Sequence, residues 1–375
     1  MGYGLGANSP IILSLGKNNF EALVNRHGQH VRWRIAKKCP CVTENNRPDL
    51  HCQKCGGTGD IYDYQREYND VFRATVRDNI ISVPEELSDA TILEVYNAYG
   101  QQYQFCRCGD FIQITGLAIP DNQLVDVRVC VPIVKRIENV ALEKVGGGYY
   151  RVPGILTPPS KLEGVFYQAA GDVIAAEGLK DSDDNQVNAL GFRRDTVLTD
   201  SETETITAGS VDYVMPVKFI VLSQNLSKED QALVNAHTGD AVCTYPYMYN
   251  LSVNDVLTVL SGTMTHKIVF EKREDNLDDT IPEFFVAKVD SIETKAASFK
   301  EGEDFILIGT NKLHWIGNQP GAGDMMSIIY RYHPTYRVAK NIPMLRTSED
   351  QRMPRKVILE LYAAFGEAKR VNQNG

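Results

Sequence analysis

The stretch CPCVTENNRPDLHCQKCGGTG, residues 39–59, says more about the fold than any other part of the sequence. It holds two cysteine pairs, joined by a loop too polar to fold by burying apolar surface. Four thiolates at this spacing suit a tetrahedral zinc ion with Zn–S distances of about 2.3 Å. The glycines after Cys55 permit the positive φ angles of a tight turn. The sequence therefore predicts a closed zinc knuckle with four ligands, Cys39, Cys41, Cys52 and Cys55.

This knuckle is predicted to build structure and not to catalyse, because four thiolates leave no open coordination position for a substrate. In small zinc modules the metal supplies on the order of 10 kcal/mol of folding free energy. The alternatives are two disulfides, four free thiols, or His51 in place of one cysteine. Eight cysteines in 375 residues are too sparse for a disulfide scaffold, so the chain is typical of a reducing cytoplasm.

The other four cysteines predict no second metal site. Cys106 and Cys108 form another C-x-C pair, but no partner pair lies near them in the sequence. We expect them to be buried free thiols at the start of a strand. Cys130 and Cys243 lie in apolar, strand-like runs and are expected in the core.

Composition and charge are those of an ordinary globular protein. Hydrophobic residues make up 43% of the chain and charged residues 23%, and the net charge is −9. An acidic surface disfavours DNA binding in a groove, although it suits a channel through which DNA slides. No apolar run approaches the ~18 residues of a membrane span. The first residues also lack the pattern of a signal peptide, and we expect no membrane contact.

Alternating apolar and polar residues predict a mainly β protein. Short strands separated by Gly, Pro, Asn and Asp turns indicate β-sandwich or barrel-like modules. Pro132 suggests that the strand around it lies at a sheet edge. Strands are predicted at 72–77, 110–115, 124–131, 131–142, 211–221, 256–260, 267–271, 284–289, 305–308, 312–315 and 327–332.

The segment before the knuckle, residues 1–38, is predicted to be an arm with a helix. The basic stretch 26–38 then reads as a strand, with Trp33 on its apolar face and Arg32 and Arg34 on a solvated face. The same basic stretch is also suited to contact nucleic acid or an acidic partner.

Two polar, acidic segments interrupt the strand pattern. Residues 168–209 are predicted to be a long exposed insertion or arm, with a short helix or loop at 169–179. Residues 181–185 hint at a calcium loop, but the required Gly and the closing Glu are missing, so calcium is rejected. Residues 272–282 are predicted to be a solvated connector.

These observations divide the chain into six segments. In order they are an N-terminal arm and helix (1–38), the zinc knuckle (39–71), a β module (72–165), a polar insertion or arm (166–209), a second β module (210–340) and a C-terminal extension (341–375).

No motif in the sequence points to catalysis. It contains no P-loop, no dinucleotide-binding turn, no H-E-x-x-H and no G-x-S-x-G. The histidines do not pair at ligand spacing apart from His27 and His30, which are expected at the surface. His333 is expected where the chain leaves a strand. We therefore expect that the protein is not an enzyme.

Two segments together carry a resemblance to a known family. The run NRHGQHVRWRIAKKCPC (25–41), followed ten residues later by CQKCGGTGDIY (52–62), resembles the N-terminal region of a family of tailed-bacteriophage structural proteins. The run EGEDFILIGTNKLHWIGNQPGAGDMMSIIYRYHPTYRV (301–338) is similar to β-hairpin modules of phage neck, tail and baseplate proteins. J-domain chaperones share the C-x-x-C-x-G-x-G pattern, but they need four copies and this chain has one.

The resemblance implies a structural virion protein that is assembled in the host cytoplasm. The expected role is a neck or head–tail connector component (adaptor, stopper or head closure) in a homo-oligomeric ring. Its expected partners are the portal or adaptor and tail or sheath-terminator proteins, and non-specific contact with packaged DNA stays open. The alternatives are a tail or baseplate protein and a cellular zinc-containing nucleic-acid-binding module.

Overall fold

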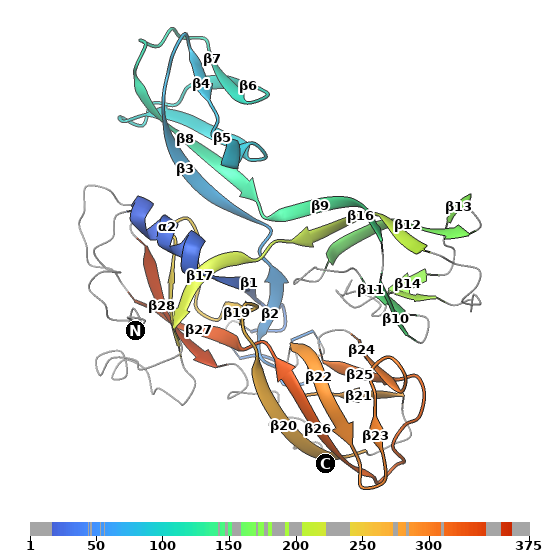
Figure 1. Ribbon diagram of the computed structural model, residues 1–375. Helices are drawn as coiled ribbons and strands as arrows, with labels where there is room; N and C mark the ends of the chain where they lie inside the picture. Colours follow the sequence, from blue (N-terminus) through green and yellow to red (C-terminus); the bar gives the residue numbers. More distant parts are fainter. Residues whose placement is uncertain are drawn as a thin grey trace, which may run out of the picture. The chain divides into compact units, whose positions relative to one another are not determined.

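The structure is a computed structural model (Figure 1). It describes residues 17–43, 45, 47–52, 54–55, 57–141, 143–146, 149–151, 159–169, 172–175, 179–181, 192–194, 205–222, 241–272, 277–282, 285–308, 311–342 and 354–361. The chain forms two compact units. Unit 1 comprises Met1–Tyr64, Lys135–Pro246 and Leu251–Gly375, and unit 2 comprises Gln65–Val134 and Tyr247–Asn250. Both are built mainly of antiparallel strands, so the predicted fold class is confirmed.

A closed barrel of six strands lies at the centre of unit 1 (Figure 1). It closes because β1 pairs antiparallel with both β17 and β19. A further strand, β2 (Asp60–Tyr64), extends the sheet beyond β1. Around the barrel the strands are β1 (Gln29–Lys38), β17 (Val217–Leu222), β18 (Ala241–Tyr245), β28 (Arg355–Leu361), β27 (Thr335–Ile342) and β19 (Val256–Val259).

The barrel collects strands from distant parts of the chain. Strand β28 lies in the segment set apart as a C-terminal extension, yet it is paired on both sides, with β18 and with β27. Strand β1 comes from the N-terminal arm. The helix before it, α2 (Lys17–His27), buries Phe20 and Val24 against Ile220 of β17. Gly28 follows the helix. Only glycine fits at this position, because a Cβ atom there would lie 2.3 Å from the carbonyl oxygen of Val24.

Strand β1 is buried on both faces, which corrects the prediction of a solvated arginine face. Trp33 is 5% exposed, but Arg32 is only 2% and Arg34 only 8% exposed. The guanidinium carbon of Arg32 lies 4.1 Å from the ring centre of Phe285 and 5.5 Å from that of Tyr64. Desolvation lowers the pKa of Arg32 to about 10, so the side chain stays charged at neutral pH.

A buried carboxylate fastens β1 to the turn before β19. Asp255 is fully buried, and its Oδ2 accepts hydrogen bonds from Trp33 Nε1 (2.9 Å) and from the N–H of Ser252 (2.9 Å). Its Oδ1 accepts a third from the N–H of Ala36 (3.0 Å). Desolvation raises the pKa of Asp255, and the three hydrogen bonds oppose that rise.

Unit 2 is a small sandwich of two three-stranded sheets around a core rich in Val and Ile. Pro132 ends the central strand of one sheet, opposite Glu67 and beyond the last pair of that strand with its other neighbour. Most of the strand predicted at 131–142 lies after it, at Val134–Ala141, and forms an edge of another sheet, as Pro132 suggested. One sheet contains β3 (Glu67–Thr75), β8 (Leu124–Pro132) and β5 (Thr91–Asn97), and the other β4 (Ile80–Ser82), β7 (Phe111–Thr115) and β6 (Gln104–Cys108). A 3-10 turn, η1, spans Glu85–Leu87.

Residues 134–214 contribute two four-stranded sheets. A strand occupies residues 172–175, so the helix or loop predicted at 169–179 is corrected, while the rejected calcium segment lies mostly outside the described residues. One sheet has the order β13 (Asp172–Ala175), β12 (Pro159–Ala169), β16 (Thr205–Val214) and β9 (Val134–Ala141). The other has the order β10 (Glu143–Gly146), β11 (Tyr149–Arg151), β15 (Phe192–Arg194) and β14 (Leu179–Asp181).

The residues between β19 and β27 form a third β module, which we call the 264–332 module. Five of its strands match those predicted between 264 and 332, with ends shifted by a few residues, and two short strands, at 278–280 and 298–299, were not predicted. One sheet has the order β20 (Met264–Glu271), β26 (Met325–Tyr332), β22 (Val286–Glu293) and β23 (Ser298–Phe299). The other has the order β21 (Asp278–Thr280), β25 (Lys312–Trp315) and β24 (Phe305–Ile308).

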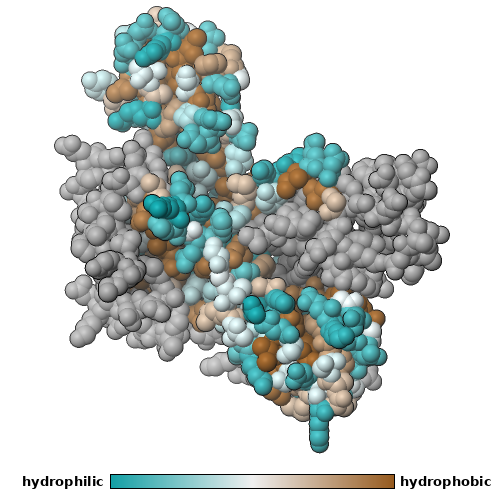
Figure 2. Space-filling view, viewed as in Figure 1, coloured by the Kyte–Doolittle hydropathy of each residue, from teal (hydrophilic) through white to brown (hydrophobic). Residues whose placement is uncertain are grey.

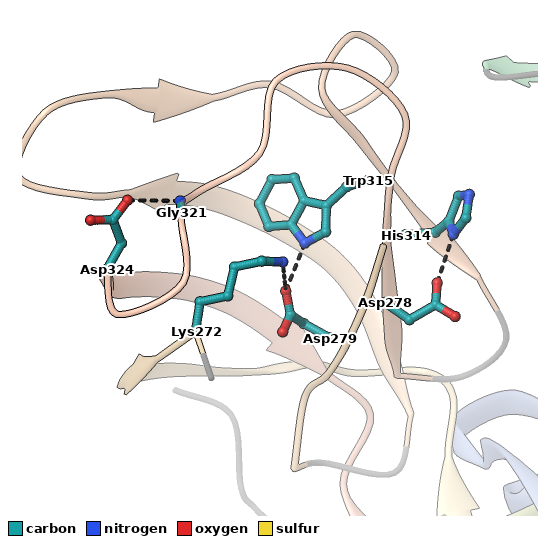
Figure 3. Close-up of polar contacts among 7 residues, drawn as sticks. All are labelled: Lys272, Asp278, Asp279, His314, Trp315, Gly321 and Asp324. Carbon is teal, nitrogen blue, oxygen red and sulfur yellow. Dashed lines mark hydrogen bonds and ion pairs between the residues drawn. The ribbon is translucent and has the colours of Figure 1, made fainter. Parts of the chain in front are cut away.

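A buried ion pair lies beside the core of this module (Figure 3). Lys272 is fully buried, and its Nζ lies 3.0 Å from Asp279 Oδ2. Trp315 Nε1 donates to the same oxygen at 2.6 Å. Ile281 is also fully buried, and residues 278–280 form a strand, so the described part of 272–282 is not the solvated connector predicted from its charge.

Replacing Asp255 with Ala is expected to destabilise the barrel strongly. The change removes the acceptor of the buried Trp33 Nε1–H and of the partly buried N–H groups of Ala36 and Ser252. An unsatisfied buried donor costs about 1–3 kcal/mol, so we expect a loss of about 2 kcal/mol or more in the free energy of unfolding, measured by urea denaturation. Glu303→Gln is the control, because its ion pair with Lys300 is exposed on both sides and should contribute less than about 1 kcal/mol. Equal losses in the two variants would contradict this role for Asp255.

Candidate metal centre

The four cysteines of the predicted knuckle lie at the tip of the β1–β2 hairpin. The last pair of the hairpin is Lys38 with Asp60, and the next residues continue the ladder through a hydrogen bond from the Cys39 N–H to the Gly59 carbonyl (2.8 Å). The 39–59 loop therefore leaves one barrel strand and returns beside it. The sequence predicted the four cysteines of the loop but not that the loop lies at the end of a β-hairpin.

The four sulfur atoms gather into one cluster. All lie within 4.8 Å of one another, with Cys39 Sγ 3.7 Å from Cys52 Sγ and Cys41 Sγ 3.6 Å from Cys55 Sγ. A disulfide would need about 2.05 Å, whereas thiolates at the corners of a zinc tetrahedron lie roughly 3.8 Å apart. The distances thus match an ion held by all four cysteines, and the four can bind a metal.

Across the residues that the structure describes, no other group of three or more His, Cys, Asp or Glu ligand atoms gathers in this way. His51, the alternative ligand, is exposed and lies outside the group. The cluster therefore consists of the four cysteines that the spacing predicted.

Two glycines let the loop fold back on itself. Gly57 has φ +78°, and a Cβ atom there would lie 2.6 Å from the carbonyl oxygen of Leu50. Gly59 has φ +85° and packs against Pro48. The turn that carries Cys55 thus needs residues without a side chain, because backbone atoms fill the space.

One thiol of the cluster, that of Cys55, ionises more readily than the thiol of an ordinary cysteine. The pKa of Cys55 is lowered to about 6. Desolvation, the largest single influence, raises it, but hydrogen bonds from the Gly59 N–H (3.4 Å to Sγ), Cys41 and Gly57 outweigh desolvation. Desolvation raises the pKa of Cys41 to about 12. A dication must therefore displace protons from other thiols, so metal affinity is expected to rise with pH.

The other four cysteines differ in how far their side chains are buried. Cys243 is fully buried, as predicted, and Cys130 is partly buried. Cys106 and Cys108 are both exposed, so the prediction of buried thiols is wrong for this pair. Their strand lies at the edge of its sheet, and the side chains point to the open face.

The polar residues of the 264–332 module form the other cluster of titratable groups that stands out (Figure 3). Lys272, Asp279 and Trp315 satisfy one another, His314 Nδ1 lies 2.6 Å from Asp278, and Asp324 accepts from the Gly321 N–H at 2.8 Å. These contacts join β21 to β25 and the loops beside them, so we assign the cluster a structural role.

No family model and no curated protein matches this chain, so the metal centre is assigned from the geometry of the four cysteines. Within the described residues, no helix has the length and apolar character needed to cross a membrane.

Removing one ligand is expected to abolish metal binding at this cluster. The cluster should hold about one ion per molecule, and Cys55→Ser should carry about one ion per molecule fewer than the wild type. A strong chelator should lower the unfolding midpoint of the wild type but leave that of Cys55→Ser unchanged, because structural metal binding contributes to folding. Elemental analysis and thermal unfolding measure both effects. Cys130→Ser, outside the cluster, is the control, and equal metal loss in it would contradict the assignment.

A methyl group at Gly57 is expected to weaken the site through the backbone. Gly57→Ala combines a positive φ with a contact too short for any Cβ, which should cost about 2 kcal/mol or more. Gly100→Ala is a matched control, because Gly100 has φ +81° but nothing within 4 Å of its Cβ position. Competition with a chromophoric chelator should show reduced metal affinity for Gly57→Ala alone, and unchanged affinity would refute the role of this turn.

Proposed function

We propose that this chain is a structural virion protein of a tailed bacteriophage, a ring-forming neck or head–tail connector component of the adaptor, stopper or head-closure kind. It links the capsid portal to the tail and contacts the portal or adaptor on one side and tail or sheath-terminator proteins on the other. No catalytic role is proposed. The support comes from the resemblance at 25–41, 52–62 and 301–338 and from the architecture.

The observation that carries this proposal is the way the chain is threaded. The barrel uses strands from its beginning, middle and end, and the other β modules are inserted between these strands. The strands of unit 2 and the two sheets of 134–214 lie between β2 and β17 in the sequence, and the 264–332 module lies between β19 and β27. A single closed hub that carries several β modules suits a part that must contact several neighbours at once.

The inserted sheets also offer open edges. Strands β13 and β9 form the two edges of one sheet, and β20 and β23 those of another. An edge strand presents unpaired backbone N–H and C=O groups, to which a strand of a neighbour can add. Repeated addition around an axis closes a ring when the rotation permits.

We propose zinc as the ion at the tip of the β1–β2 hairpin. Four soft thiolates in a tetrahedron favour zinc among the divalent ions of a reducing cell. With four protein ligands the ion has no open position, so its role is to hold the loop in shape.

The nucleic-acid alternative rested on the basic stretch 26–38. Arg32 and Arg34 of that stretch are buried, so they are not presented to a phosphate backbone. The net charge of −9 also opposes tight DNA binding and suits a lumen that DNA must pass without adhering. The structure offers no observation that favours the baseplate alternative over the neck.

Native mass spectrometry and negative-stain electron microscopy of the full chain test this proposal. We expect closed rings of one order as the protein concentration rises, with zinc bound to every subunit. In a gel-shift assay with duplex DNA at low and physiological salt, we expect no salt-sensitive shift. A chain that stays monomeric at every concentration, or one that shifts DNA strongly at low salt, would argue against a ring-forming connector.

A further inference from the structure

The exposed C-x-C pair of unit 2 forms a rigid surface dithiol. Cys106 and Cys108 lie two residues apart on β6, so they share one face of the strand, and their sulfurs are 3.9 Å apart. Arg107, between them, points the other way and donates to the carbonyl oxygens of Ser88, Ala90 and Gly109. These bonds hold the strand in position, so the placement of the two thiols does not depend on a bond between them.

The sheet face around this dithiol carries no charge. Strand β6 pairs with β7, which pairs with β4, and residues directly opposite one another share a face. The two cysteines and their six exposed neighbours on this face are all uncharged side chains. They are Ile80, Ser82, Gln104, Cys106, Cys108, Phe111, Gln113 and Thr115.

Part of this face is apolar. Ile80 is 41% and Phe111 51% exposed, and apolar side chains reach the surface of unit 2 among polar ones (Figure 2). Phe111 lies directly opposite Cys108 in the ladder. The dithiol thus has apolar surface beside it that gains from leaving water.

The geometry of the pair suits a metal better than a disulfide. Residues two apart in an extended strand have Cα atoms about 6.6 Å apart, at the upper limit of the range that a disulfide spans. The sulfur separation of 3.9 Å is close to the ~3.8 Å edge of a zinc tetrahedron. The same chain already places a C-x-C pair, Cys39 and Cys41, on two corners of its first cluster.

Two thiolates fill half of a tetrahedral site. In the described part of the chain, no third His, Cys, Asp or Glu ligand atom joins Cys106 and Cys108. A second copy of the chain can supply the two missing ligands. An uncharged, partly apolar face can meet its own copy without electrostatic repulsion, and two such faces bring together four thiols.

We propose that Cys106 and Cys108 form half of a second four-thiolate metal site, which the same two cysteines of a second copy of this chain complete. The contact is isologous, with one residue set used on both sides, so it joins copies in pairs. It goes beyond the connector role and does not rest on it, because a ring needs a separate, heterologous contact. Paired copies without rings would leave this inference standing while the connector proposal failed.

The test follows mass and metal content together in the full chain. The reduced protein is stripped with a chelator, transferred to metal-free buffer and titrated with zinc, and native mass spectrometry counts ions and copies. We expect zinc to double the mass and to bring the metal content to about 1.5 ions per chain, one in each knuckle and one shared between two copies. The double variant Cys106→Ser/Cys108→Ser should stop at about 1 ion per chain and should not pair.

Gln104→Ser is the matched control, because Gln104 lies on the same strand and face, two residues before Cys106. It should pair like the wild type. Equal unfolding midpoints of wild type and double variant, both metal-free, would show that the serines leave the fold intact.

Three outcomes would overturn the proposal. The first is identical pairing and metal content in the wild type and the double variant. The second is a monomer that takes up a second ion, which would make the dithiol a site within one copy. The third is pairing that survives the chelator and disappears with a reductant, which would show a disulfide between copies.

Discussion

Strand β1 pairs along its length with three partners, and the rest of unit 1 depends on this. Its first residues pair with β17, its middle with β19 and its last with β2. The first two pairings close the barrel, and closure removes the exposed edges that an open sheet would present. The third begins the hairpin that ends in the cysteine cluster. One strand thus couples the core of the molecule to its candidate metal centre.

Because of this coupling, a metal ion in the cluster would stabilise the barrel as well as the loop. An ion at the hairpin tip restrains both β1 and β2, and the free energy of binding adds to the folding free energy of the strand that closes the barrel. Polar loops of this length gain little from burial, so a metal held by the four cysteines would take the place of an apolar core. The inserted modules are built differently, around apolar cores of their own.

Buried polar groups mark the places where separate elements meet. Asp255 joins β1 to the turn before β19, and Lys272 with Asp279 joins the two sheets of the 264–332 module. Arg32 stacks on Phe285, just before β22. Each carries an ionisable side chain, and the sequence alone suggested solvent for Arg32 and for the Lys272 segment. They are buried because elements from distant parts of the chain pack over them, and that packing exists only in the folded protein.

The sequence by itself determined the mainly β fold class, the helix at Lys17–His27 and the four clustered cysteines, because alternation, helical spacing and ligand spacing are local properties. Tertiary structure decided the closure of the barrel by β1 and β28, the burial of Arg32 and Lys272, and the exposure of Cys106 and Cys108. These features depend on partners up to hundreds of residues away. A strand's pattern shows which residues alternate, but whether its polar face meets water or another module is set by what packs against it.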